Sequence, residues 1–193
     1  MSLQKINTRN IVLVLMILAA TAMRVVSYKY PTVLSNFTPV GAIALFGGVY
    51  FTDKWKAYVV VLLSLFLSDV VINHFYTSQW TFFSSDTFWN CVCFSIMVFI
   101  GSRIKQLNMT SGVLILFAPV LVHWLIMDLP WINDAVGLYP KTLAGYGSAL
   151  IAAIPFEKNM LLGDIVFGAI LFGAFELAKS KYTTLRTSHK LAL

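Results

Sequence analysis

Residues 57–75 read AYVVVLLSLFLSDVVINHF, a run of 19 positions in which Asp69 alone carries a full charge at neutral pH. An α-helix needs about 20 mostly apolar residues to cross the hydrocarbon core of a bilayer. The run therefore predicts a transmembrane helix. Because a charge inside a span is costly, Asp69 is a candidate for an ion pair or a function.

Apolar runs of similar length recur along the whole chain. We predict six transmembrane spans, at residues 10–28, 34–51, 57–75, 82–101, 111–130 and 160–178. The second span contains Pro39, Gly41, Gly47 and Gly48. Membrane helices tolerate proline and glycine where neighbouring helices shield the backbone, so we expect this span inside the bundle. A seventh run, residues 145–156, would rise only about 18 Å, which predicts a short re-entrant or interfacial helix.

The composition excludes a soluble fold. The 193 residues are 59% hydrophobic and 11% charged, with a mean hydropathy of +0.79, and a soluble surface carries more charge than this. Polar stretches are no longer than loops. We predict an all-α polytopic membrane protein in which residues 1–193 form a single integral membrane domain, without a separate catalytic or nucleotide-binding domain.

The basic residues predict the orientation. A formal charge of +6 could indicate nucleic acid, but in so apolar a chain the positive-inside rule explains it better, and we expect no nucleic-acid partner. With six spans and a cytoplasmic N-terminus, four basic residues face outside, namely Arg24, Lys29, Lys141 and Lys158. Ten face the cytoplasm, namely Lys5, Arg9, Lys54, Lys56, Arg103, Lys105, Lys179, Lys181, Arg186 and Lys190. We therefore predict a multi-pass protein of the bacterial inner (plasma) membrane with both termini cytoplasmic.

Four ionisable residues fall at a similar depth in this topology. Each lies three to seven residues from the outer end of its span, about 5 to 10 Å below the membrane boundary; they are Arg24, Asp69, Asp128 and Asp164. Such a layer predicts the polar floor of an outward-facing cavity. The alternative is that Arg24 pairs with Asp69 or Asp164 only to neutralise charge and fix the helix register.

Helical spacing adds two neighbours to this layer. Asn73 follows Asp69 by four residues and Trp124 precedes Asp128 by four, so each pair shares one helix face. His123 lies in the middle of the fifth span, and no second metal-ligating residue stands at ligand spacing in that helix. We therefore expect a hydrogen-bonded core histidine there, with no metal site and no cofactor.

The outer loops and the fourth span supply further candidates. Trp80, Trp131 and Tyr139 form either the usual interfacial aromatic belt or a lid over a ring-bearing ligand. Cys91 and Cys93 are two residues apart and cannot form an ordinary disulfide on a helix. Both are expected to be small buried hydrophobic side chains. The alternative for Cys91 is a soft ligand at the outer cavity for a metal such as the cobalt of a corrinoid.

Several blocks of the chain resemble a family of small, functionally uncharacterised bacterial membrane proteins. They are NFTPV at 36–40, ALFGGVYF at 44–51, SD at 68–69, YPKT at 139–142, AIPF at 153–156 and NMLLGD at 159–164. In size, topology and outer polar layer, that family is similar to the substrate-binding S components of energy-coupling-factor vitamin transporters, including the solitary cobalamin-transporting kind.

This resemblance implies a six-helix bundle with a vitamin-sized pocket under the outer loops, which topples or rocks to deliver its ligand inward. S components that dock on a shared energising module carry an Ala-x-x-x-Ala motif in the first helix. Ala19, Ala20 and Ala22 lack that spacing, which favours a solitary or differently partnered protein. The predicted substrate-binding residues are Arg24, Asn36, Asp69, Asn73, Trp80, Cys91, Trp124, Asp128, Trp131, Tyr139 and Asp164.

Three functional hypotheses follow. The first is uptake of a small, vitamin-like molecule by a protein that contacts membrane lipids, its ligand and an energising module or other membrane subunits. The second is a non-transporting accessory subunit of a larger membrane complex. The third, an intramembrane enzyme using Asp69, His123 or Asp164, has the least support because the chain lacks HExxH, GxxxxGK[ST] and GxGxxG motifs and a Ser-His-Asp order. We therefore do not expect an enzyme.

Overall fold

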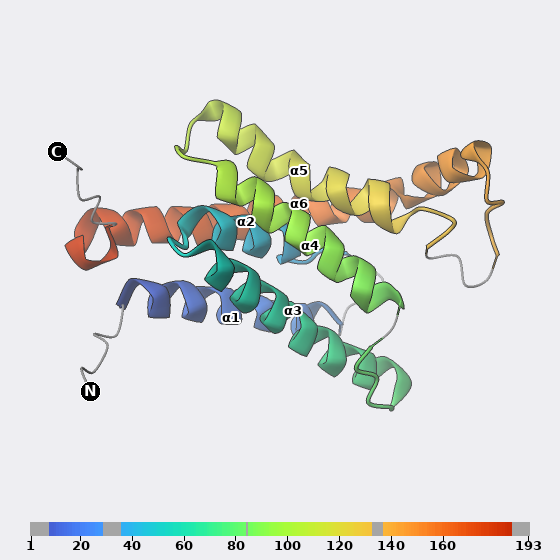
Figure 1. The fold of residues 1–193 in the computed structure, drawn as a ribbon, viewed down its shortest axis with the longest axis horizontal. Coiled ribbons are helices and arrows are strands. Elements are labelled where there is room, and N and C mark those ends of the chain that lie inside the picture. Colours follow the sequence, from blue (N-terminus) through green and yellow to red (C-terminus); the bar gives the residue numbers. More distant parts are fainter. Residues whose placement is uncertain (1–7, 29–35, 84, 133–136, 187–193) are drawn as a thin grey trace.

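The computed structural model describes residues 8–28, 36–83, 85–132 and 137–186, and this part of the chain is all-helical (Figure 1). Its helices are α1 (Thr8–Tyr28), α2 (Val40–Tyr50), α3 (Lys54–Thr77), α4 (Ser85–Arg103), α5 (Met109–Met127), α6 (Leu143–Lys181) and the 3-10 turn η1 (Thr183–Leu185). The predicted fold class is confirmed. Lys5, Lys29 and Lys190, whose sides of the membrane were predicted, lie outside the described residues.

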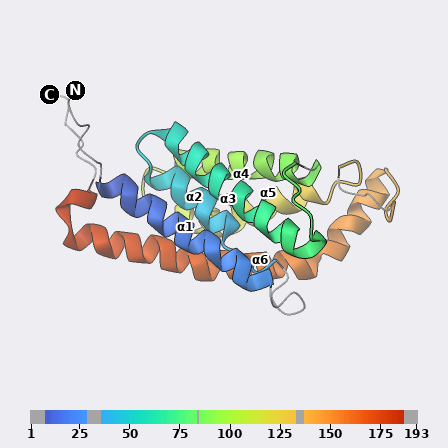
Figure 2. The same cartoon turned by 90° about the horizontal axis from the view of Figure 1, so that it is seen from below.

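Successive helices run in opposite directions through one bundle (Figures 1 and 2). The start of α1 and the end of α6 therefore lie at the same end, which we call the termini end. The C-terminal ends of α1, α3 and α5 lie at the opposite end, together with the start of α4. This alternation is the one that six successive spans require, whereas the side of the membrane that each end faces stays a prediction.

Four helices of the described residues are long and apolar enough to cross a membrane: α1 over Thr8–Val25, and α3, α5 and α6 over their whole lengths. Their outward faces are apolar rather than polar. On α3, for example, Val59, Leu63 and Leu67 follow one another at four-residue spacing and are each more than half exposed. Exposed apolar stripes of this kind suit hydrocarbon and not water, which supports a membrane protein.

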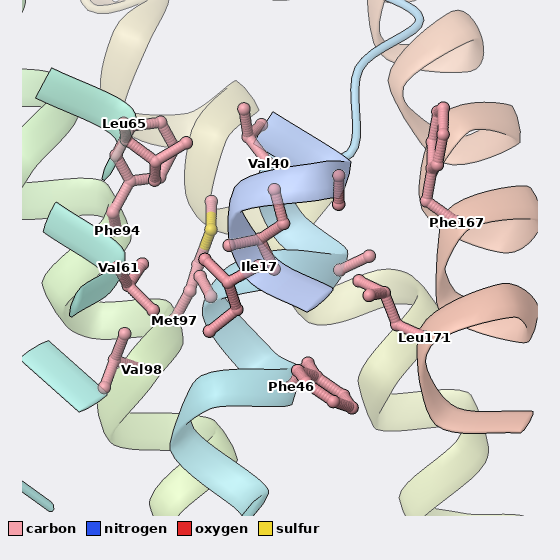
Figure 3. Close-up of a cluster of buried hydrophobic side chains, with 14 of the residues drawn as sticks. Ile17, Val40, Phe46, Val61, Leu65, Phe94, Met97, Val98, Phe167 and Leu171 are labelled. Atoms are coloured by element: carbon pink, nitrogen blue, oxygen red, sulfur yellow. The ribbon is translucent and has the colours of Figure 1, made fainter. Parts of the chain in front are cut away.

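α2 is shorter than the predicted second span at residues 34–51. Its 11 residues rise about 16 Å, roughly half the thickness of the hydrocarbon core. All of them except Val49 are buried, and α2 contacts α1, α3, α4, α5 and α6. The prediction that this segment packs inside the bundle is confirmed. Figure 3 shows Phe46 of α2 among the buried apolar side chains that its neighbours contribute.

Glycines allow α2 to lie this close to its neighbours. A Cβ on Gly48 would lie 2.4 Å from the carbonyl oxygen of Val98, and one on Gly101 would lie 2.6 Å from that of Leu45. α2 and α4 therefore touch through their backbones, as small residues permit in membrane helices.

α6 differs most from the prediction. Residues 145–156 do not form a separate short helix, because one helix of 39 residues runs from Leu143 to Lys181 and includes both this run and the predicted sixth span. Pro155 lies inside it, and Figure 2 shows the N-terminal part of α6 turning away from the rest. At 1.5 Å per residue α6 is about 58 Å long, more than a bilayer core requires. Proline explains why the helix bends instead of ending.

Candidate functional site

The predicted layer of four ionisable residues separates into three environments. Arg24 of α1 and Asp69 of α3 form an ion pair, with 2.7 Å between Nη2 and Oδ1. Arg24 also donates to the Ser68 hydroxyl and, at 3.3 Å, to the carbonyl oxygen of Leu65. Of the two partners considered for Arg24, the structure therefore selects Asp69, and the pair fixes α1 against α3.

The side chain of Asp164, a residue of α6, lies against the start of α2. Asp164 is 1% exposed, and its Oδ1 atom accepts a hydrogen bond from the backbone N–H of Ala42 at 2.8 Å. The first turn of a helix has N–H groups without partners inside the helix, and its positive end favours a carboxylate. Asp164 thus caps a helix that begins inside the bundle. It is not among the side chains that line the two cavities described next.

Two polar cavities lie at the end of the bundle opposite the termini. The first, which we call the Asn73 cavity, has a volume of about 320 Å³. It lies between α3 and α4 and is lined by Asp69, Asn73, Thr77, Thr81, Asp86, Thr87 and Asn90. The i, i+4 pair of Asp69 and Asn73 faces this cavity together, as the helical spacing predicted.

The second, the His123 cavity, has a volume of about 280 Å³. It is lined by Asn36, Asp86, Asn90, His123, Met127, Asp128, Ala153, Phe156 and Glu157, which come from α4, α5, α6 and the segment before α2. Asp86 and Asn90 line both cavities, so the two spaces adjoin across one face of α4. Together they bring Asn36, Asp69, Asn73 and Asp128 of the predicted set to one region.

His123 and Glu157, which both line the His123 cavity, are in polar contact with each other. The Nδ1 atom of His123 lies 2.9 Å from Oε1 of Glu157. Glu157 is 5% exposed, and its second oxygen, Oε2, is buried without a hydrogen-bond partner among the described residues. A buried carboxylate oxygen without a donor is costly. A ligand group that reached Oε2 from the cavity that Glu157 lines would supply this missing donor.

Glu157, Asp86 and Asn90 were absent from the predicted site. Glu157 precedes Asp164 by seven residues, two helical turns, so both carboxylates share one face of α6. In the predicted arrangement Glu157 fell between a short helix ending at 156 and a span starting at 160, which hid this spacing. Asp86 and Asn90 are four apart, the same signal that identified Asp69 and Asn73.

The remaining predicted residues lie outside the two cavities or at their edge. Trp124 donates from Nε1 to the carbonyl oxygen of Leu150 at 3.0 Å and so joins α5 to α6. Trp80 stacks on His74 with ring centroids 3.9 Å apart, and Trp131 is half exposed. Tyr139 and Asp128 share a smaller cavity of about 200 Å³. Cys91 and Cys93 are free thiols, and neither lines the Asn73 or the His123 cavity.

A model of the family of unknown function DUF6580 matches residues 4–186 of the chain. The chain belongs to this family. No curated protein and no solved structure matches the chain. The chemistry of the site in this DUF6580 protein is therefore inferred from the residues of this chain alone.

The cavities of this DUF6580 protein are acceptor-rich. Asp86, Asp128 and Glu157 supply carboxylates to the His123 cavity, and among the described residues that line it the one basic group is the imidazole of His123. Within the described part of the chain, no three His, Cys, Asp or Glu side chains lie together in a group that could hold a metal ion. The arrangement is suited to binding a ligand through hydrogen bonds and charge.

Proposed function

We propose that this protein binds a small, vitamin-like molecule at the end of its bundle opposite the termini and carries it across the membrane. The observation that supports binding is Glu157, which lines a cavity of about 280 Å³ and whose Oε2 atom is a buried acceptor without a hydrogen-bond partner among the described residues. Ionisable groups inside membrane bundles commonly mark substrate pathways. The adjoining Asn73 cavity of about 320 Å³ extends the space available to a ligand.

The lining predicts the charge of the ligand. Three carboxylates face the His123 cavity, whereas Asp69 in the Asn73 cavity is already paired with Arg24. Among the described residues that line this cavity, only the imidazole of His123 beside Glu157 can offset these carboxylates. In an apolar bundle, such an excess of carboxylates repels an anion and stabilises a positively charged donor. We therefore propose an organic ligand that carries a protonated amine or a similar cationic group, with Glu157 and Asp128 as its acceptors.

The position of the cavities supports the proposal of transport. They are confined to one end of a small alternating bundle, and the positive-inside rule predicts that this end faces outside. A protein with this organisation captures its ligand on that side and must rearrange or tilt to release it inward, as the similarity to S components implies. The predicted location is the bacterial inner membrane, with an energising module or another membrane subunit as the partner.

Native mass spectrometry of the protein purified in lipid nanodiscs tests binding directly. We expect a small-molecule adduct on the wild-type chain that is lost in Glu157→Gln, since glutamine keeps the shape of the side chain and removes its charge. Asp53→Asn is the matched control, because Asp53 forms an exposed pair with Lys56 at the other end of the bundle. This control should retain the adduct.

A second measurement tests the charge of the ligand. Thermal unfolding is followed with thiamine and pyridoxamine as cationic probes, and with biotin and pantothenate as anionic probes. Stabilisation by a cationic probe that disappears in Glu157→Gln supports the proposal. If none of the four probes stabilises the protein and no adduct co-purifies, the accessory-subunit hypothesis becomes the better explanation.

A further inference from the structure

A fourth, larger cavity lies at the termini end, far from the proposed ligand site. It has a volume of about 590 Å³ and is bounded by α1, the last turn of α2, the α4–α5 connection and the end of α6. Four cationic side chains line it, against one carboxylate, Glu176. The four are Arg9, Lys105, Lys179 and Arg186. We call this space the basic pocket.

The carboxylate in the basic pocket is already engaged. Oε1 of Glu176 accepts from the ammonium of Lys179 at 2.6 Å and from the hydroxyl of Tyr50 at 2.6 Å. Among the described residues that line the pocket, Glu176 is the only carboxylate, against four cationic side chains. The pocket has a net positive charge in a protein that is otherwise poor in charge.

Two of these cations are held in place by backbone contacts. Arg9 is 8% exposed and donates to the carbonyl oxygen of Tyr50, which joins the start of α1 to the end of α2. Arg186 donates from Nε to the carbonyl oxygen of Lys179 at 3.0 Å and from Nη2 to that of Ser180 at 2.8 Å. A guanidinium has five N–H donors, so those two bonds leave other donors of Arg186 for a ligand.

The pocket also has an apolar wall. Val49, Ile104 and Leu107 line it beside the cations. It therefore offers both a positively charged surface and an apolar surface, at an end of the bundle where helices leave the apolar region. Guanidinium and ammonium groups bind phosphate oxygens strongly, and basic pockets between membrane helices on the cytoplasmic side are typical sites for anionic lipid headgroups.

We propose that the basic pocket binds a phosphate group, supplied by the phosphodiester of an anionic lipid headgroup. The apolar wall favours the lipid over free phosphate, because it can contact the glycerol and the first methylenes of the acyl chains. The positive-inside rule places this end in the cytoplasm, where the membrane surface is anionic. This inference does not depend on the proposed transport function.

The test uses the full chain in vesicles that contain equal amounts of phosphatidylglycerol and phosphatidylcholine, followed by native mass spectrometry of the lipids retained after extraction. Wild type should retain phosphatidylglycerol in preference to phosphatidylcholine. The double variant Lys105→Ala/Arg186→Gln should lower that retention by about tenfold or more, since each basic side chain near a membrane surface contributes to anionic-lipid binding. Both side chains are exposed or half-buried, so the fold should survive.

The control is the double variant Lys141→Ala/Lys158→Ala. It also removes two positive charges, from exposed positions at the other end of the bundle. This control should retain phosphatidylglycerol as wild type does. A parallel experiment adds millimolar inorganic phosphate: retention that persists supports a lipid headgroup, whereas displacement identifies a site for free phosphate and contradicts the lipid assignment. Equal retention in the two double variants, or equal retention of the two lipids, would overturn the proposal.

Discussion

The Oδ1 atom of Asp164 accepts a hydrogen bond from the backbone N–H of Ala42 at 2.8 Å, across 122 positions of sequence. This contact explains how α2 can begin inside a membrane bundle. A helix that starts there exposes N–H groups that hydrocarbon cannot satisfy. The carboxylate of α6 satisfies one of them, and Gly41 leaves room for it, since a Cβ on Gly41 would lie 2.3 Å from Oδ2 of Asp164.

Asp164→Ala should therefore reduce the free energy of unfolding by about 1 to 3 kcal/mol, because it leaves a buried N–H without its acceptor. Asp164→Asn keeps a side-chain oxygen in the same place and should lose less. Thermal unfolding in nanodiscs measures both. A wild-type midpoint for Asp164→Ala would contradict the capping role, and loss of ligand capture without loss of stability would return Asp164 to the binding site.

The ion pair between Arg24 and Asp69 should show strong coupling in a double-mutant cycle. Removing either partner alone leaves a partly buried charge and should cost about 3 to 5 kcal/mol. Removing both should cost less than the sum of the two single changes. The cycle of Arg24 with Asp164 is the control and should be additive within about 0.5 kcal/mol, because no contact joins these residues in the structure. Additivity in the cycle with Asp69 and coupling in the cycle with Asp164 would instead mean that Arg24 pairs with Asp164 of α6.

Gly48→Ala should destabilise the protein by about 1 to 3 kcal/mol, because its Cβ would press on the carbonyl oxygen of Val98 and force α2 away from α4. Gly173→Ala is the matched control within a helix. Nothing lies within 4 Å of the added Cβ at that position, so stability should stay the same or rise by up to about 1 kcal/mol. Similar effects of the two changes in thermal unfolding would show that Gly48 does not act through close packing.

The predicted orientation can be tested by labelling cysteines in intact cells. A membrane-impermeant thiol reagent added outside should label Lys141→Cys and leave Lys181→Cys unlabelled. Both positions are exposed. Lys141 lies just before the start of α6, and Lys181 is the last residue of α6. The unsubstituted chain controls for reaction at Cys91, which is half-buried. Labelling of Lys181→Cys would place the termini, and with them the basic pocket, outside.

The membrane environment and the order of the helices were predictable because they depend on local properties. The run at 57–75 lies within α3, a helix long and apolar enough to cross a membrane, because hydropathy and a rise of 1.5 Å per residue act on any such segment alike. The shared face of Asp69 and Asn73, which line one cavity together, also follows from helical periodicity. No knowledge of neighbouring helices is needed for these features. Asp128, by contrast, lies just past the end of α5, and Trp124 lines neither cavity that Asp128 lines.

The lengths of α2 and α6 could not be derived in this way. α2 begins at Val40 because Asp164 and the small residues around it make a buried helix start possible, and that contact joins distant parts of the chain. Pro155 predicts a boundary when residues 145–156 are considered alone, yet α6 continues through it with a bend. In a bundle, neighbouring groups can satisfy the backbone atoms that proline releases.

The roles of the carboxylates depend most on tertiary contacts. Glu157 and Asp164 lie two turns apart on one face of α6, and helical periodicity makes them equivalent. Packing makes them different, because Asp164 meets the first turn of α2 while Glu157 meets His123 at the edge of a cavity. Each keeps one buried oxygen without a hydrogen-bond partner among the described residues. Of the two, only Glu157 lines one of the described cavities, so the fold decides which of the two carboxylates lies beside space for a ligand.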